Sequence, residues 1–98
     1  MKPVYFLVNI RIKDAQTYGK YLERVDKVFE GSGGKYLAVD EQPDVLEGTW
    51  NYTRSVLIRF DSEDDFRKWY ESAAYQEIIK YRLNASDCDG ILIHGIEE

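Results

Sequence analysis

The stretch of sequence that decides the fold spans residues 46–82 and reads LEGTWNYTRSVLIRFDSEDDFRKWYESAAYQEIIKYR. It places the carboxylate of Glu47 and the guanidinium groups of Arg54 and Arg82 among several large aromatic side chains. Charged groups are costly to bury unless they are paired or hydrogen-bonded. The stretch therefore predicts a small polar pocket within an aromatic wall, although it does not by itself identify a reaction.

The same stretch predicts a strand followed by two helical segments. Residues 55–60 are rich in Val, Leu and Ile, which is typical of a central strand. Ser62 can cap a helix whose apolar stripe includes Trp69. The helical spacing breaks near Ser72, so we expect a second helical segment that carries Arg82.

The N-terminal part of the chain predicts a strand and a helix. Residues 4–12 alternate apolar with mixed side chains, and this period of two is typical of a strand. Asp14 can supply an N-cap oxygen for a helix whose apolar residues, from Tyr18 to Phe29, follow helical spacing. Glycines within residues 31–34 can end this helix, because glycine adopts the left-handed conformation at low cost.

Three further segments predict strands. Residues 35–40 form a second strand, and residues 91–96 form the last one. Residues 45–48 predict either an edge strand or a continuation of the second strand past a bulge. Alternation assigns the side chains of the second strand to two faces, with Leu37 and Val39 on one and Tyr36 and Ala38 on the other.

The predicted order is β-α-β-β-α-β within a single domain that covers residues 1–98. Two β-α-β units with right-handed crossovers produce a ferredoxin-like α+β fold, in which an antiparallel four-stranded sheet carries both helices on one face. Residues 55–60 keep apolar side chains on both faces, with Val56, Ile58 and Phe60 on one face and Ser55 and Leu57 on the other. An uncovered apolar face favours a homodimer in which two sheets pack against each other.

Composition excludes several classes of protein. The formal net charge of -5 disfavours a nucleic-acid-binding protein, which needs a basic stripe to neutralise phosphates. The apolar run near the N-terminus is too short to span a membrane and lacks a cleavage site, so we expect a cytoplasmic protein without membrane contact. One cysteine, one histidine and no glycine-rich phosphate loop predict no disulfide, no metal and no cofactor.

A set of motifs distributed over the chain carries a family resemblance. These motifs are Tyr18, Tyr21, Gly33-Gly34-Lys35-Tyr36, Leu46-Glu47-Gly48, Arg54, Phe60, Trp69-Tyr70-Glu71-Ser72, Tyr75-Gln76 and Arg82. With them the chain resembles domain of unknown function 1330 (DUF1330), a family of the dimeric α/β-barrel superfamily. The resemblance implies a ferredoxin-like protomer whose sheet packs on that of its twin. Because the superfamily includes cofactor-free monooxygenases, isomerases and haem enzymes, the resemblance implies no single activity.

Glu47 and Arg54 are the candidate catalytic residues. They lie seven residues apart across a loop, so we expect them to meet at one end of the sheet. Together they can hold a polar substrate, or Glu47 can act as a base if it is partly desolvated. The alternative is an ion pair that only orders the loop of residues 48–53.

The candidate ligand-binding residues are Tyr21, Trp69, Tyr70, Tyr75 and Arg82. Their rings can offer flat surfaces to an aromatic ligand, and buried phenols need hydrogen-bond partners. Arg82 follows Tyr75 by two helical turns and shares its helix face, where a guanidinium needs a carboxylate, a carbonyl or a ligand anion. The alternatives are that the rings belong to the core and that Arg82 forms a salt bridge with Glu47 or a contact at a helix C-terminus.

His94 and Cys88 are interpreted as structural residues. His94 lies in the predicted last strand, where a satisfied side chain is more common than a proton shuttle or a haem ligand. Cys88 precedes that strand, and no basic neighbour in the sequence activates its thiol.

These observations predict a small-molecule-binding protein. Its specific form, which the resemblance implies, is a cofactor-independent enzyme of monooxygenase or isomerase type that acts on a small polar or aromatic metabolite. In that hypothesis Arg54 and Arg82 hold an anionic or carbonyl group, Tyr70 and Tyr75 donate hydrogen bonds, and Glu47 moves a proton. The alternative is a non-catalytic dimeric binding or stress-associated protein in which the polar cluster is structural.

Overall fold

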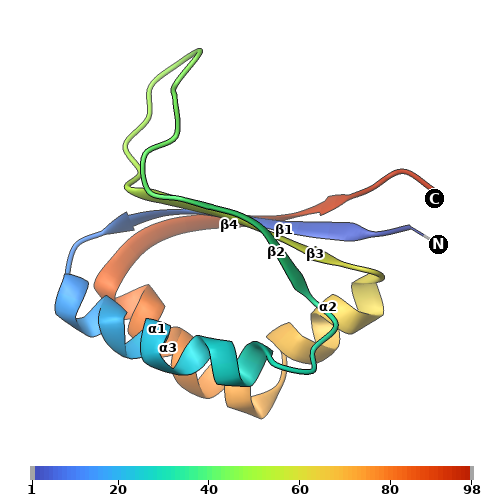
Figure 1. Cartoon of the computed structure of the whole chain (residues 1–98). Helices are drawn as coiled ribbons and strands as arrows, with labels where there is room; N and C mark the ends of the chain where they lie inside the picture. Colours follow the sequence, from blue (N-terminus) through green and yellow to red (C-terminus); the bar gives the residue numbers. More distant parts are fainter. Residues whose placement is uncertain (1, 98) are drawn as a thin grey trace.

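The computed structural model describes residues 2–97, and it confirms the predicted ferredoxin-like α+β fold. Four antiparallel strands form one sheet in the order β2-β3-β1-β4. Figure 1 shows the helices together on one side of this sheet. Along the chain the elements are β1 (Val4–Ile12), α1 (Ala15–Phe29), β2 (Lys35–Asp40), β3 (Arg54–Phe60), α2 (Glu63–Tyr70), α3 (Ala73–Ala85) and β4 (Ser86–His94).

The core lies between the sheet and the helices, because alternate side chains of β1 and β3 point toward the helices. Phe6 of β1 pairs across the ladder with Ile58 of β3, and both side chains are buried. Phe60 is fully buried, and its ring centroid lies 5.5 Å from the centroids of both Phe66 and Trp69. This aromatic cluster holds α2 against the end of β3.

Side-chain caps determine where the helices begin. Asp14 and Ser62 each accept a hydrogen bond from the backbone N–H three residues later, at 3.1 and 3.2 Å. The Ser72 hydroxyl caps α3 by accepting from the Tyr75 N–H at 3.1 Å, and it donates to the Trp69 carbonyl at 2.7 Å. The predicted break near Ser72 is therefore the boundary between α2 and α3.

The predicted faces of β2 are wrong, because the strand contains a bulge. The register with β3 shifts between Tyr36 and Ala38, so that Tyr36 pairs with Ile58 and Val39 pairs with Val56. The extra residue turns Tyr36 and Val39 to the same side of the sheet, toward the helices.

Two other predicted strand boundaries differ from the structure. Residues 45–48 do not form a strand; they lie in the loop between β2 and β3, which projects beyond the sheet in Figure 1. β4 begins at Ser86 rather than at residue 91, because the chain pairs with β1 directly after α3. Cys88 therefore lies within the last strand and not before it.

The face of the sheet opposite the helices carries a row of apolar side chains. Leu7 of β1 is flanked across the two ladders by Leu57 and Ile91. Ile91 and Ile93 are exposed within the protomer. The predicted apolar character of this open face is therefore present in the structure.

Candidate functional site

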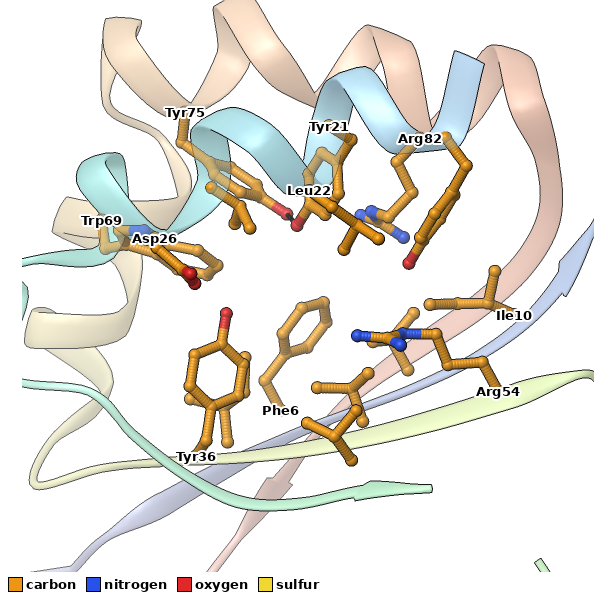
Figure 2. A pocket seen from close by; sticks show the side chains of 16 residues that line it. Phe6, Ile10, Tyr21, Leu22, Asp26, Tyr36, Arg54, Trp69, Tyr75 and Arg82 are labelled. Atoms are coloured by element: carbon orange, nitrogen blue, oxygen red, sulfur yellow. Dashed lines mark hydrogen bonds between the residues drawn. The ribbon is translucent and has the colours of Figure 1, made fainter. Parts of the chain in front are cut away.

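A cavity of about 410 Å³ lies between the helices and the helix-facing side of the sheet. Side chains from α1 and α3 form one wall, and side chains from β1, β2 and β3 form the opposite wall (Figure 2). The exposed rim consists of Leu22 and Asp26 on α1 and of Tyr36 and Val39 on β2. The cavity therefore opens between α1 and the edge strand, and its size is within the range of small-molecule sites.

The inner wall of the cavity is aromatic, because β1, α2 and α3 each direct a large ring into it. The rings of Trp69 and Tyr75 lie 4.1 Å apart between centroids, and the ring of Phe6 lies 6.4 Å from Trp69. All three side chains are buried. Such rings offer a planar ligand a large contact area without loss of much side-chain entropy.

Tyr21 and Tyr75 form a buried pair of phenols in the wall. Their hydroxyl oxygens are hydrogen-bonded at 2.8 Å. Burial raises the pKa of Tyr21, and the neighbouring Tyr75 raises it further. Burial also raises the pKa of Tyr75, although the Arg82 guanidinium opposes that increase. Both phenols therefore stay protonated near neutral pH, and the pair can donate a hydrogen bond.

Arg82 is a buried cation without an acidic partner. Its residue is 4% exposed, Nη1 donates to the Cys88 Sγ at 3.1 Å, and Nε has no hydrogen-bond partner. Burial opposes the charge, but the phenols of Tyr75 and Tyr21 raise the pKa of Arg82 overall. The salt bridge with Glu47, which was one alternative to a binding role, does not form. Cys88, which has no basic neighbour in the sequence, gains one from the tertiary structure.

Arg54 lines the same cavity but has a different partner from the one we predicted. Its Nη1 donates to Glu41 Oε1 at 3.1 Å, whereas the expected pair with Glu47 does not form. Nε is buried and has no hydrogen-bond partner. The guanidinium carbon lies 6.0 Å from the centre of the Tyr18 ring, so the aromatic face offsets part of its desolvation.

Two predicted site residues lie outside the cavity. Glu47 is exposed in the loop between β2 and β3, where it lines a shallow hollow with Trp50. Tyr70 is half-buried and stacks on Phe66 at 5.2 Å between centroids, so its ring fills space in the core. The cavity instead brings together Arg54, Tyr21, Trp69, Tyr75 and Arg82, whose roles in binding remain a prediction.

Two rim residues, Asp26 and Tyr36, were missed by reasoning from the sequence. Asp26 follows the buried Val25 on α1, and this position beside the apolar stripe is the signal that could have identified it. Tyr36 lines the cavity together with Val39 because of the bulge in β2, and no pattern in the sequence predicts this bulge. Burial raises the pKa of Tyr36 to about 12, and the nearby Asp26 contributes to that increase.

Within the described residues, His94 is hydrogen-bonded to an acidic side chain, and neither a metal centre nor a membrane-spanning helix is found. His94 is exposed on β4, and its Nε2 lies 3.0 Å from Glu63 Oε1, which satisfies the ring. Across residues 2–97, no three His, Cys, Asp or Glu side chains gather so as to hold a metal ion. None of the described helices has the length and apolar character needed to cross a membrane.

The family model described as Domain of unknown function (DUF1330) matches residues 3–96. No curated protein matches the sequence. Every motif that carries the resemblance lies within these residues.

Many solved structures share the fold, among them these three. The RPA0582 protein of unknown function from Rhodopseudomonas palustris has 21% identity and a TM-score of 0.80, over 98% of this chain and 84% of that chain. SnoaB, a cofactor-independent oxygenase from Streptomyces nogalater, has 10% identity and a TM-score of 0.71, over 100% and 97%. A dimeric ferredoxin-like protein of unknown function from Thermobifida fusca has 15% identity and a TM-score of 0.69, over 97% and 92%. At these identities the similarity shows the fold alone.

Proposed function

The chain belongs to the family described as a domain of unknown function, DUF1330, and we propose that it binds a small polar or aromatic metabolite in the cavity beneath α1. The observation that carries this proposal is the pair of guanidinium groups in the aromatic wall. Both Arg54 and Arg82 leave a buried Nε without a hydrogen-bond partner. Both guanidinium groups line the cavity, and a buried cation such as Arg82, which has no carboxylate partner, favours an anionic or strongly polar ligand beside it.

Thermal denaturation in the presence of small aromatic and polar acids tests this proposal. A ligand that binds only the folded state raises the melting temperature in proportion to the logarithm of its concentration. We expect this increase in the unmodified protein and its loss in Arg82→Gln. Arg67→Gln is the matched control, because Arg67 is an exposed arginine that pairs with Glu63 on α2. An increase that survives in Arg82→Gln would contradict the proposal.

We also propose that the protein is a homodimer that forms through the open face of the sheet. Leu7, Leu57 and Ile91 make an apolar row there, and a solved structure with the same fold is described as dimeric. The loop between β2 and β3 rises on the same side of the sheet, and its Leu46 is 91% exposed (Figure 1). Sedimentation equilibrium should show a dimer that Leu57→Lys converts to a monomer; an unchanged dimer would exclude this interface.

Cofactor-independent catalysis is the second candidate function, and the phenol pair favours it. Tyr21 and Tyr75 share a hydrogen bond beside the Arg82 cation, an arrangement that can stabilise negative charge developing on a substrate oxygen. A solved structure with this fold is that of a cofactor-independent oxygenase. The proton-moving role that we predicted for Glu47 finds no support in its position, because this carboxylate is exposed and does not line the cavity.

Oxygen uptake with quinol-like aromatic probes separates catalysis from simple binding. If the protein is an oxygenase, Tyr75→Phe should slow oxygen uptake more than it weakens probe binding, because the phenol acts on the developing charge. Glu47→Gln should leave both quantities unchanged. Binding without any oxygen uptake would exclude the oxygenase. If the bound probe is also recovered chemically unchanged, the alternative holds, in which the protein is a non-catalytic binding or stress-associated dimer.

A further inference from the structure

The polar groups of the cavity are separated by charge. Figure 2 shows Arg54 and Arg82 together near Ile10, at the end of the cavity away from Trp69. Asp26 and Tyr36 lie toward the other end, on the side where Figure 2 shows Trp69. Apolar and aromatic side chains occupy the space between the two ends. The cavity is therefore a dipolar site, with a cationic inner end and an acidic rim.

The cationic end is short of negative charge. Arg82 is 4% exposed, and its Nη1 donates to the thiol sulfur of Cys88, a weak acceptor. Arg54 has one carboxylate partner, Glu41, whose own side chain is 77% exposed and therefore well solvated. Both guanidinium groups line the cavity, and a ligand carboxylate between them can accept hydrogen bonds from both.

At the acidic end, the carboxylate of Asp26 has no hydrogen-bond partner among the described residues. Within residues 2–97 the carboxylate of Asp26 forms no hydrogen bond or ion pair, although its charge acts on the neighbouring phenol of Tyr36. The raised pKa of Tyr36, about 12, keeps that phenol neutral. A carboxylate beside a neutral phenol accepts a hydrogen bond from a hydroxyl or an amino group and disfavours a second anion.

We propose that the ligand is a planar aromatic acid that carries a hydroxyl or amino group at the end opposite its carboxylate. This inference deepens the proposed function and rests on it. The carboxylate lies at Arg54 and Arg82, the ring contacts Trp69, and the donor group reaches Asp26 at the rim. The charge separation of the cavity fixes the orientation of the ligand as well as its class.

Binding of four matched probes tests the two ends separately. Benzoate and benzamide have nearly the same shape but differ in charge, and 4-hydroxybenzoate and 4-methoxybenzoate differ in whether the second group can donate. Calorimetric titration should give benzoate at least about tenfold tighter binding than benzamide, which corresponds to about 1.4 kcal/mol. It should also give 4-hydroxybenzoate tighter binding than 4-methoxybenzoate, because only the former donates to Asp26.

Two variants assign these differences to residues. Arg82→Gln should remove the advantage of benzoate over benzamide. Asp26→Ala removes the acceptor and should remove most of the advantage of 4-hydroxybenzoate over benzoate while benzoate itself binds as before. Glu23→Ala is the matched control for Asp26→Ala, because Glu23 is an exposed acid on the same helix that does not line the cavity.

The outcomes distinguish this inference from the proposed function. Equal affinities for benzoate and benzamide, or an Asp26→Ala protein that still prefers 4-hydroxybenzoate, would overturn the dipolar site and leave the binding cavity in place. Failure of all four probes to bind would overturn both proposals for aromatic ligands. A preference for benzoate that disappears in Arg82→Gln, together with a hydroxyl preference that disappears in Asp26→Ala, supports both ends of the site.

Discussion

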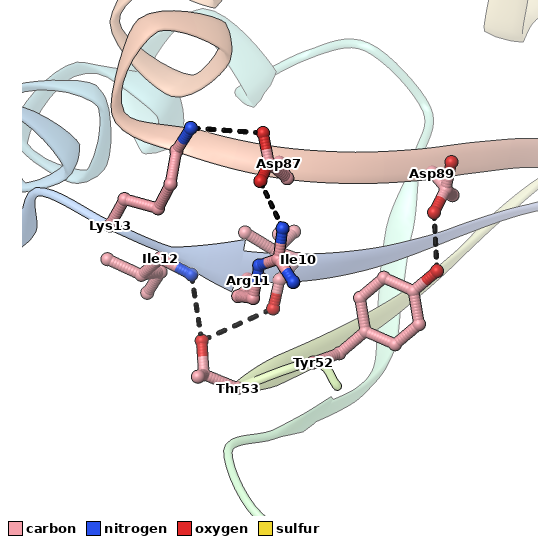
Figure 3. A network of polar contacts seen from close by, with 8 residues as sticks. All are labelled: Ile10, Arg11, Ile12, Lys13, Tyr52, Thr53, Asp87 and Asp89. Carbon is pink, nitrogen blue, oxygen red and sulfur yellow. Dashed lines mark hydrogen bonds and ion pairs between the residues drawn. The ribbon is translucent and has the colours of Figure 1, made fainter. Parts of the chain in front are cut away.

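The two sides of the sheet differ in how their charged side chains are paired and exposed. On the open face, Arg11 and Lys13 both pair with Asp87, and the Tyr52 hydroxyl donates to Asp89 (Figure 3). These groups are partnered and largely exposed. On the helix-facing side, Arg82 is buried and has no acidic partner.

This difference indicates which polar groups serve the fold and which serve a ligand. An exposed ion pair is nearly neutral in its effect on stability, so the network of the open face needs no functional explanation. A buried, unpaired cation destabilises the folded state unless something else compensates for it. Proteins keep such groups mainly where function requires them, and the cavity is therefore the part of the molecule to test.

The largest expected effect is on stability, and it distinguishes Phe60 from Leu57. These residues lie three positions apart on β3 and face opposite sides of the sheet. Phe60→Ala should lower the free energy of unfolding by about 3–5 kcal/mol, because it removes a fully buried ring. Leu57→Ala should cost about 1 kcal/mol in the protomer, and its effect should grow when protein concentration favours the dimer. Chemical denaturation at two protein concentrations measures both. Equal, concentration-independent losses would refute the contrast between the faces.

The second prediction concerns Arg82 itself. Arg82→Met should raise the free energy of unfolding of the ligand-free protein by about 1–4 kcal/mol, because an apolar side chain replaces an unpaired buried charge. The same variant should no longer be stabilised by benzoate. Thermal denaturation with and without benzoate measures both effects. If Arg82→Met is less stable than the unmodified protein, the guanidinium supports the fold and the contrast between buried and exposed charges is lost.

A third prediction compares two phenol hydrogen bonds. Tyr21→Phe leaves the buried Tyr75 hydroxyl without its phenol partner and should cost about 1–2 kcal/mol. Tyr52→Phe removes a hydrogen bond to Asp89 on the open face and should change stability less, since water can replace the lost partner. Urea unfolding curves of the two variants give the comparison. A larger loss of unfolding free energy in Tyr52→Phe than in Tyr21→Phe would contradict this prediction.

The smallest expected effect is the pH dependence that Asp87 contributes. Hydrogen bonds from Arg11 and Lys13 hold the pKa of Asp87 below its usual value. The folded pKa is depressed, so this contribution is present above the unfolded value of about 3.9 and is lost as pH falls through the folded pKa. Asp87→Asn should therefore flatten slightly the acid limb of a plot of melting temperature against pH. An unchanged acid limb would show that the pair contributes nothing measurable.

Much of the fold was predictable because its signals are local. The alternation in residues 4–12, the caps at Asp14 and Ser62 and the break near Ser72 depend only on neighbouring residues, and the structure confirms each of them. The boundaries that failed are set by pairing with distant strands. β4 begins early because Ser86 meets Ile12 of β1, a partner that no local pattern reveals.

The candidate site was predictable only in part, for the same reason. Tyr75 and Arg82 share a face because helical spacing is regular, and both line the cavity. Tyr70 is adjacent in sequence to Trp69 but packs on Phe66 instead, since successive residues of a helix point about 100° apart. Adjacency in a motif therefore did not imply adjacency in the cavity.

The sequence by itself determined the order of the elements, the apolar faces of β1 and β3, and the family. Only the tertiary structure decided which charges meet: Arg54 pairs with Glu41 and not with Glu47, and a bulge in β2 turns Tyr36 toward Asp26. The physical reason is that periodicity arises from the geometry of a single element. Contacts between elements depend on register, on bulges and on loop paths, and a shift of one residue changes the face that a strand side chain occupies.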